Sequence, residues 1–301
     1  MRNSPAKDLL ATTQSLALLL EALDMVRDER IRALAEKDVL YRRELGRRRR
    51  FQRLLIQAEG FNAYTTQPDF MPVRIKRSPA PRGTFLICGS MGGGDMISKL
   101  EFEGTLSSVN CDQIYIKDFE KIWYQNGLMG MTENREETIN FLKSLLQDFP
   151  RPLTVLGASA GGYAALLFGH ALDAERIVTF GAQTLLTRHV VRVYSDPRDH
   201  RTRFRHDMPE NDLRKVLIEN PLSGHAEMHF SDKNKLDTRQ HGYLADLPNI
   251  TQIAHDSRPH NVSIRLKAQG KLIDILDPPE VAEQEVRPVS PLSDGDNFHA
   301  S

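Results

Sequence analysis

The stretch LTVLGASAGGYAALL, residues Leu153 to Leu167, decides the fold of this chain. A short β-branched apolar run leads into a G-x-S-x-G turn, and a segment rich in alanine and leucine follows it. In a nucleophile elbow the serine occupies a strained turn between a strand and a helix, so its neighbours must be small. We therefore predict that Ser159 is a nucleophile in such a turn. In the simpler interpretation, Ser159 only caps the helix in a tight glycine turn.

The catalytic interpretation requires an acid and then a histidine further along the chain. A strand predicted over 226–230 runs into the loop 231–237, which we expect at the carboxyl end of the sheet. Two aspartates compete for the acid position there. We favour Asp237, which stands just before a helix predicted over 238–244, and keep Asp232 as the alternative acid. Either aspartate could instead be a helix cap or a solvated loop charge.

The general base must come from the next loop. A strand predicted over 249–254 ends at a loop that contains His255 and His260. The imidazole must reach Ser159, and the acid must hold its tautomer. We favour His260 because it directly precedes a helical run over 262–276, whereas His255 is close enough to the strand to be a wall or structural residue. Two other histidines are interpreted as surface or packing residues, namely His229 and His241.

A second glycine-rich segment lies upstream. A strand predicted over 83–88 opens into the loop GSMGGGD at 89–95. The N–H of Ala160 at the start of the elbow helix is the first predicted oxyanion donor, and Ser90 and Met91 are the others. A phosphate-binding loop is disfavoured, because neither a G-K-[ST] ending nor a G-x-G-x-x-G spacing is present. In a third interpretation the glycines serve only a tight turn.

Further elements follow from apolar spacing and composition. Trp123 and Tyr124 are expected to pack in a core. A polar stretch at 187–211 has no period and is expected to cover the site as a loop or short helices. The remaining predicted elements are strands over 113–118 and 176–181 and helices over 133–149 and 210–220.

Several of these segments together are similar to those of a known group of proteins. They are Asp118 to Gly130, the elbow at 157–166, Phe180 to Gln183, and His260-Asn261-Val262. Across residues 83–277 they resemble bacterial α/β-hydrolase-like proteins, a poorly characterised type associated with surface-glycan or glycosyltransferase contexts. The resemblance implies an α/β-hydrolase fold, a mostly parallel sheet with helices on both faces. It also implies Ser159, Asp237 and His260 as nucleophile, acid and base. Two departures are Ala160, where methionine is more frequent, and Ser231, which replaces a glycine.

Composition narrows the class of protein. The chain has 301 residues, a net charge of +0 and 40% apolar residues, which argues for one sizeable core and against a nucleic-acid-binding protein. Its two cysteines, Cys88 and Cys111, indicate reduced thiols and a cytoplasmic location. No apolar run is long enough to span a bilayer. Neither metal-ligand spacing nor a cofactor motif occurs, so we expect no cofactor and no metal.

The two ends of the chain differ from the middle. Residues 1–60 are predicted to form a helical, coiled-coil arm, which we interpret as a homo-oligomerisation seam; a lone helix docked on the body is the alternative. We interpret its arginine cluster at 42–53 as a solvated face of the helix, and a peripheral membrane contact is the alternative. Residues 61–82 are expected to be a linker with an edge strand at 73–76, and 278–301 a disordered, acidic, proline-rich tail.

The function predicted from the sequence is serine-dependent hydrolysis or acyl transfer on an ester or acyl group. The substrate is expected to be a small molecule or a glycan or its precursor. The alternative is a non-catalytic, hydrolase-like accessory protein in surface-glycan assembly, in which Ser159 is a relic of the turn. The long helical arm motivates this alternative, because a small esterase does not need one.

Overall fold

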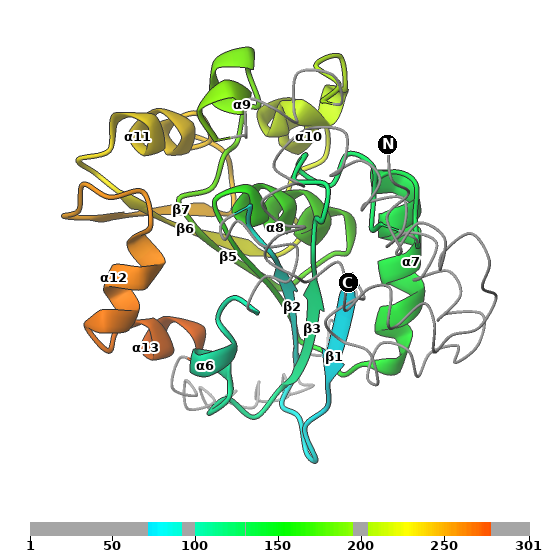
Figure 1. Ribbon diagram of the computed structural model, residues 1–301. Helices are drawn as coiled ribbons and strands as arrows, with labels where there is room; N and C mark the ends of the chain where they lie inside the picture. The colour runs from blue at the N-terminus through cyan, green and yellow to red at the C-terminus, as the bar shows by residue number, and fades with distance from the viewer. Residues whose placement is uncertain (1–71, 92–99, 130, 195–203, 278–301) are drawn as a thin grey trace, which may run out of the picture.

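A computed structural model describes residues 72–91, 100–129, 131–194 and 204–277. Within them lies a seven-stranded sheet with the strand order β1-β3-β2-β4-β5-β6-β7 (Figure 1). β1 pairs antiparallel with β3, and every other pairing is parallel. The strands are β1 Val73–Lys76, β2 Thr84–Cys88, β3 Asp112–Ile116, β4 Leu153–Ala158, β5 Arg176–Phe180, β6 His225–Ser231 and β7 Ile250–His255.

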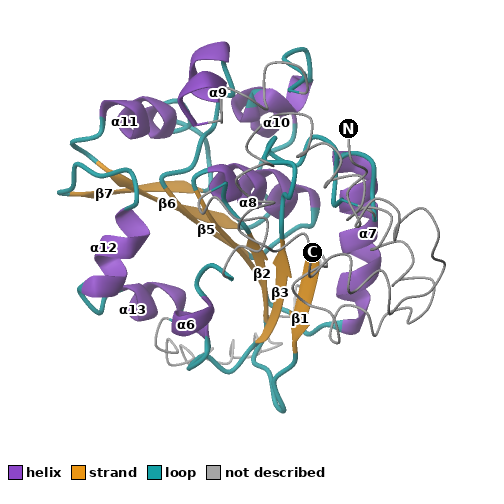
Figure 2. Cartoon of the chain, in the orientation of Figure 1, coloured by secondary structure: helices purple, strands orange, loops and turns teal. Residues whose placement is uncertain are grey.

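Helices cover both faces of this sheet (Figure 2). The elbow helix, α8, packs on one face with α7 and α10, and the short helices α6, α12 and α13 lie on the other. The described helices are α6 Glu103–Leu106, α7 Arg135–Leu145, α8 Ala160–Ala171, α9 Arg188–Tyr194, α10 Leu213–Glu219, α11 Lys235–Gly242, α12 Val262–Ala268 and α13 Leu272–Leu276.

The central strand β4 contributes to both cores. Val155 points into the larger core beneath α8, and the next residue, Leu156, points into the smaller core against α12 and α13. Because successive side chains of a strand point to opposite faces, a strand covered on both faces is apolar along most of its length. This explains why the run before the serine has no polar alternation.

The predicted strands over 83–88, 113–118, 176–181, 226–230 and 249–254 are confirmed to within two residues, as is the edge strand at 73–76. Strand β4 leads into helix α8 at Ser159, as the opening stretch predicts.

Three helix predictions need correction. The helix expected over 238–244 begins earlier, at Lys235, because the side chain of Asn234 caps it by accepting from the N–H groups of Leu236 and Asp237. Asp237 therefore lies in the first turn of α11 and not in the loop before it. The run expected over 262–276 is two helices, since Gly270 adopts φ 73° between α12 and α13.

The helix expected over 133–149 is also shorter than predicted. It begins at Arg135, after the Asn134 side chain accepts from the N–H of Glu137, and it tightens into a 3₁₀ turn at Leu146–Asp148. In this segment Leu142 and Leu145 are buried, whereas Ile139, Phe141 and Leu146 are partly buried.

Several predicted features lie outside the described residues. They are the arm at 1–60 with its arginine cluster, most of the linker, the loop at 92–99 that follows Met91, part of the polar stretch at 195–203, and the tail at 278–301. Among the described helices, none is long and apolar enough to cross a membrane. Cys88 and Cys111 are both buried and free.

Candidate active site

Ser159 sits at the tight turn between β4 and α8. Its backbone has φ 53° and ψ −118°, a conformation that side-chain-bearing residues rarely adopt. A Cβ on Gly157 would overlap the carbonyl group of Gly161, and a Cβ on Gly161 would overlap the carbonyl oxygen of Cys88 on β2. Glycine is therefore required at both positions because backbone approaches backbone there.

The structure brings together Ser159 and two of the predicted partners. His260 Nε2 lies 2.9 Å from Ser159 Oγ, and His260 Nδ1 lies 2.7 Å from Asp237 Oδ1. An ionised carboxylate only accepts hydrogen bonds, so Nδ1 carries the proton and Nε2 accepts from the serine hydroxyl. The Asp237 side chain is 2% exposed and that of His260 is 21% exposed. The arrangement can move a proton from Ser159 to His260.

The first turn of α11 supplies Asp237 to this arrangement. Asn234 caps the helix through the N–H of Asp237, which fixes the start of the turn. A carboxylate in the first turn is also favoured by the helix dipole. The first turn of α11 thus sets the position of the Asp237 carboxylate beside His260.

The alternative acid has a different role. Asp232 is exposed, and its Oδ1 accepts from the N–H of Ser257, while its own N–H donates to the carbonyl of His255. These bonds tie the end of β6 to the loop that carries His260. Asp232 therefore braces the loop, and Asp237 is the aspartate that contacts the histidine.

The histidine itself is held by its neighbours. The Ser231 hydroxyl donates to the carbonyl of Pro259 at 2.6 Å, and the N–H of Val262 donates to the carbonyl of His260 at 2.9 Å. Gly181, with φ 59°, lies directly beneath the ring: a Cβ there would come within 3.1 Å of His260 Cε1 and of its carbonyl oxygen. Sequence reasoning missed this role of Gly181, although a glycine as the last residue of the predicted strand was the available signal.

Sequence reasoning also missed a contact to the serine. The Nε2 of Gln183 donates to Ser159 Oγ at 2.9 Å, and its Oε1 accepts from Trp123 Nε1 at 3.2 Å. Trp123 and Tyr124 are buried, as predicted. Trp123 and Gln183 lie in segments that carry the family resemblance, but the sequence does not show that they meet the serine, because these contacts join positions 24 and 60 residues apart.

The three predicted oxyanion donors lie in two segments. Ala160 is the first residue of α8, where a backbone N–H has no acceptor within its own helix. The N–H of Ser90 donates to Glu101 Oε1 at 3.2 Å, and the Ser90 hydroxyl bonds the same oxygen. Met91 is partly buried against the larger core. Ser90 would have to exchange Glu101 for a substrate oxygen in order to act as a donor.

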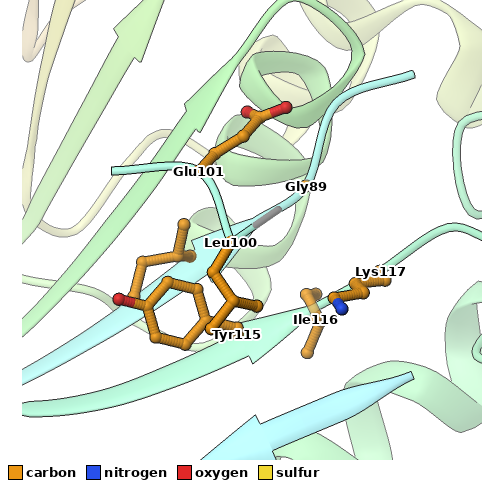
Figure 3. Close-up of a pocket in the computed structure, with 7 residues that line it drawn as sticks. Gly89, Leu100, Glu101, Tyr115, Ile116 and Lys117 are labelled. Carbon is orange, nitrogen blue, oxygen red and sulfur yellow. The ribbon is translucent and has the colours of Figure 1, made fainter. Parts of the chain in front are cut away.

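Glu101, the hydrogen-bond partner of Ser90, lines a small pocket together with Gly89 (Figure 3). The Glu101 carboxylate points away from the apolar side chains of Leu100 and Tyr115 at the other end of the pocket. Burial raises the pKa of Glu101 above its ordinary value, against the effect of its hydrogen bonds from Ser90. The lining residues are Ile87, Gly89, Leu100, Glu101, Tyr115, Ile116 and Lys117.

The other histidines are packing residues. His255 Nε2 lies 3.0 Å from His229 Nδ1, and the two rings stack with centroids 5.2 Å apart. His241 is fully buried and contacts Gln252 Oε1 through Nδ1 at 3.1 Å. Its burial lowers its pKa to about 3, so it is neutral. Among the described residues, no group of three or more histidine, cysteine, aspartate or glutamate side chains could hold a metal ion.

Neither a protein-family model nor a curated protein sequence matches the chain. Solved structures are similar to it. The capsule O-acetyltransferase of Neisseria meningitidis serogroup A is 16% identical, with a TM-score of 0.50 over 67% of this chain and 92% of that one. Fluorophosphonate-binding serine hydrolase F of Staphylococcus aureus is 14% identical, with a TM-score of 0.51 over 68% and 91%.

A third similar structure covers more of the chain. It is the 2,6-dihydroxy-pseudo-oxynicotine hydrolase, 14% identical, with a TM-score of 0.50 over 90% of this chain and 81% of that one. At such identities the likeness concerns the fold. The parallel sheet, the helices on both faces and the strained serine turn after β4 agree with these neighbours. The chain therefore has the α/β-hydrolase fold.

Proposed function

We propose that the protein is a serine hydrolase or acyltransferase that acts on an ester or acyl group through Ser159, His260 and Asp237. One observation carries this proposal: the two hydrogen bonds that join Ser159 Oγ to His260 and His260 to Asp237, at 2.9 and 2.7 Å. A serine that only capped a helix would need neither partner. The order serine, acid, histidine along the chain is also that of the fold's catalytic triads.

Acylation begins when Ser159 Oγ attacks the carbonyl carbon of the substrate. The hydroxyl proton passes to His260 Nε2, the new O–C bond forms, and the carbonyl π electrons move onto its oxygen. Asp237 stabilises the resulting imidazolium through Nδ1. When the intermediate collapses, the bond to the leaving group breaks and His260 gives it the proton. The product of this half-reaction is an acyl ester of Ser159.

Deacylation repeats these steps with a second nucleophile. Water or an acceptor hydroxyl gives its proton to His260 Nε2 and attacks the acyl carbon. Ser159 Oγ then leaves and takes the proton back from His260. We propose the N–H of Ala160 as a donor to the oxyanion in both steps, with Ser90 and Met91 as candidates for the second donor.

The identity of the acceptor separates a hydrolase from an acyltransferase. One structural neighbour is a capsule O-acetyltransferase and two others are hydrolases. We propose a carbohydrate hydroxyl as the candidate acceptor beside water. Incubating the protein with an activated acetyl ester and a panel of monosaccharides tests this. Acetylated sugar that forms while the rate of ester consumption stays constant indicates transfer, whereas release of free acetate alone indicates hydrolysis.

A fluorophosphonate probe tests the proposed nucleophile. The probe should label the wild-type protein on Ser159 and should not label the Ser159→Ala variant. Ser107→Ala removes an exposed hydroxyl that bonds only the carbonyl of Gly104 among the described contacts, so this control should react like wild type. A folded wild-type protein that the probe does not label would contradict the proposal and favour a non-catalytic accessory role.

A further inference from the structure

The amide side chain of Gln183 contacts the proposed nucleophile, Ser159, although Gln183 is neither the proposed acid nor the proposed base. Gln183 is 1% exposed and lies shortly after β5, and its Nε2 is 2.9 Å from Ser159 Oγ. Ser159 Oγ therefore has two described hydrogen-bond partners, Gln183 and His260. The buried Gln183 amide is thus in direct contact with the oxygen atom that we propose to react.

Trp123 settles which end of the amide faces the serine. An indole N–H can only donate, so the Gln183 atom at 3.2 Å from Trp123 Nε1 must be the amide oxygen. The amide NH₂ then faces Ser159 and donates to Oγ. Because Oγ accepts from Gln183, its own proton is directed to His260 Nε2. The amide thus selects the hydroxyl orientation that the proposed proton transfer needs.

Trp123 is itself fixed in place. It is fully buried, and its φ of 56° lies in the left-handed region, which is costly for a bulky residue. Arg135 holds its carbonyl oxygen through Nε at 3.2 Å and Nη2 at 3.1 Å, and the Phe204 ring packs edge-on against the indole at 5.4 Å. Strained backbone persists where the surroundings over-determine it, and it gathers at functional sites.

We infer that Gln183 is a further catalytic residue of this site and that Trp123 is the residue that positions it; the inference rests on the proposed serine chemistry. As Ser159 Oγ loses its proton to His260, the Gln183 N–H stabilises the negative charge that grows on Oγ before the O–C bond forms. In deacylation Oγ is the leaving group, and the same N–H stabilises the charge that it takes up.

Gln183→Met tests the inference, because methionine keeps the volume and removes the donor. The second-order rate of labelling by a fluorophosphonate should fall by about 10- to 100-fold, toward the loss seen when one fixed donor is removed from a reacting oxygen. Gln125→Met is the matched control. Gln125 is also fully buried, but it bonds Arg205 and Asn211 and not the serine, so its variant should label at the wild-type rate even if its Tm falls.

Trp123→Phe tests the positioning role. It removes the indole N–H that fixes the Gln183 amide oxygen, so the amide group of Gln183 can flip. The labelling rate of this variant should fall by less than that of Gln183→Met, and the double variant should be no slower than Gln183→Met alone. Effects that multiply in the double variant would show that Trp123 acts by packing and would overturn its positioning role.

The outcomes separate this inference from the proposed function. If the folded wild-type protein is not labelled at Ser159, the proposed function fails and the role of Gln183 fails with it. If wild type is labelled and Gln183→Met reacts as fast as Gln125→Met, only the role of Gln183 is overturned. A fall confined to Gln183→Met and Trp123→Phe supports the inference.

Discussion

At the scale of single residues, Ser159 holds a backbone conformation that costs free energy, with φ 53° and ψ −118°. Glycine tolerates this region and alanine does not. We expect Ser159→Gly to exceed Ser159→Ala in free energy of unfolding by about 1–3 kcal/mol, the typical cost of such strain. Urea unfolding of the two variants measures the difference. Since neither variant has a nucleophile, equal stabilities would mean that the elbow is not strained.

The two aspartates near β6 give a second prediction. Asp237→Asn should slow fluorophosphonate labelling roughly 10³- to 10⁴-fold, because the amide cannot hold the histidine tautomer that accepts the serine proton. Asp232→Asn keeps an acceptor for the N–H of Ser257 and should label within a few-fold of wild type. Labelling kinetics of both variants settle the choice. A greater loss in Asp232→Asn would reverse the assignment of the acid.

At the scale of elements, the end of β5 and the loop before α12 meet at Gly181. In Gly181→Ala the new methyl group would lie 3.1 Å from His260 Cε1, and φ 59° would be strained for alanine. We expect a loss of about 1–2 kcal/mol in the free energy of unfolding and a labelling rate reduced at least tenfold as the imidazole is displaced.

Gly270 provides the matched control for this variant. It has φ 73°, and a Cβ added to it would meet nothing within 4 Å. Gly270→Ala should therefore lose similar stability at the turn between α12 and α13 and keep the wild-type labelling rate. If both variants lose the same reactivity, backbone strain alone would explain the effect, and the contact of Gly181 with His260 would be unimportant.

Element patterns in the sequence predict the strands well and the site partly. The apolar runs of β2, β4 and β5 are short and bounded by turns, so their positions follow from local signals. The start of α11 does not follow from apolar spacing, because the Asn234 side chain caps the helix before its first apolar residue. The preference for Asp237 over Asp232 came from the predicted helix and the resemblance. What separates the two aspartates in the structure is that Asp237 points inward to His260 from a helical turn.

The contacts of Gln183 could not be predicted from local patterns. Its two partners, Trp123 and Ser159, come from other segments that only the folded sheet brings together. No periodicity or motif marks such a pairing. Local sequence signals therefore predict the elements and the order of the proposed serine, aspartate and histidine along the chain, and tertiary packing determines the rest of the site.

At the scale of the whole molecule, buried His241 makes stability depend on pH. Burial is the main cause that lowers its pKa from 6.5 to about 3; the hydrogen bond from His241 Nδ1 to Gln252 Oε1 opposes this effect, and electrostatic interactions with His260 and His229 add to it. Between these two values the unfolded chain binds a proton that the folded chain does not. The free energy of unfolding should therefore fall as the pH falls from 6.5 to about 3.

Each pKa unit corresponds to about 1.4 kcal/mol, so the His241 contribution across this window is on the order of 5 kcal/mol. His241→Met should flatten the pH dependence of urea unfolding, even though it loses the contact with Gln252. His189 is exposed on α9, and His189→Met should leave the dependence as it is in wild type. An unchanged slope in His241→Met would show that other groups control acid unfolding.

The proposed chemistry requires that Ser159 of this α/β-hydrolase fold forms an acyl-enzyme. The most direct measurement is the mass of the protein quenched in acid after brief exposure to p-nitrophenyl acetate, followed by mapping of the modified peptide. We expect one acetyl group per chain, located on Ser159, together with a stoichiometric burst of p-nitrophenol and no adduct in Ser159→Ala. A folded wild-type protein that carries no acetyl group, or carries it equally in Ser159→Ala, would contradict the account.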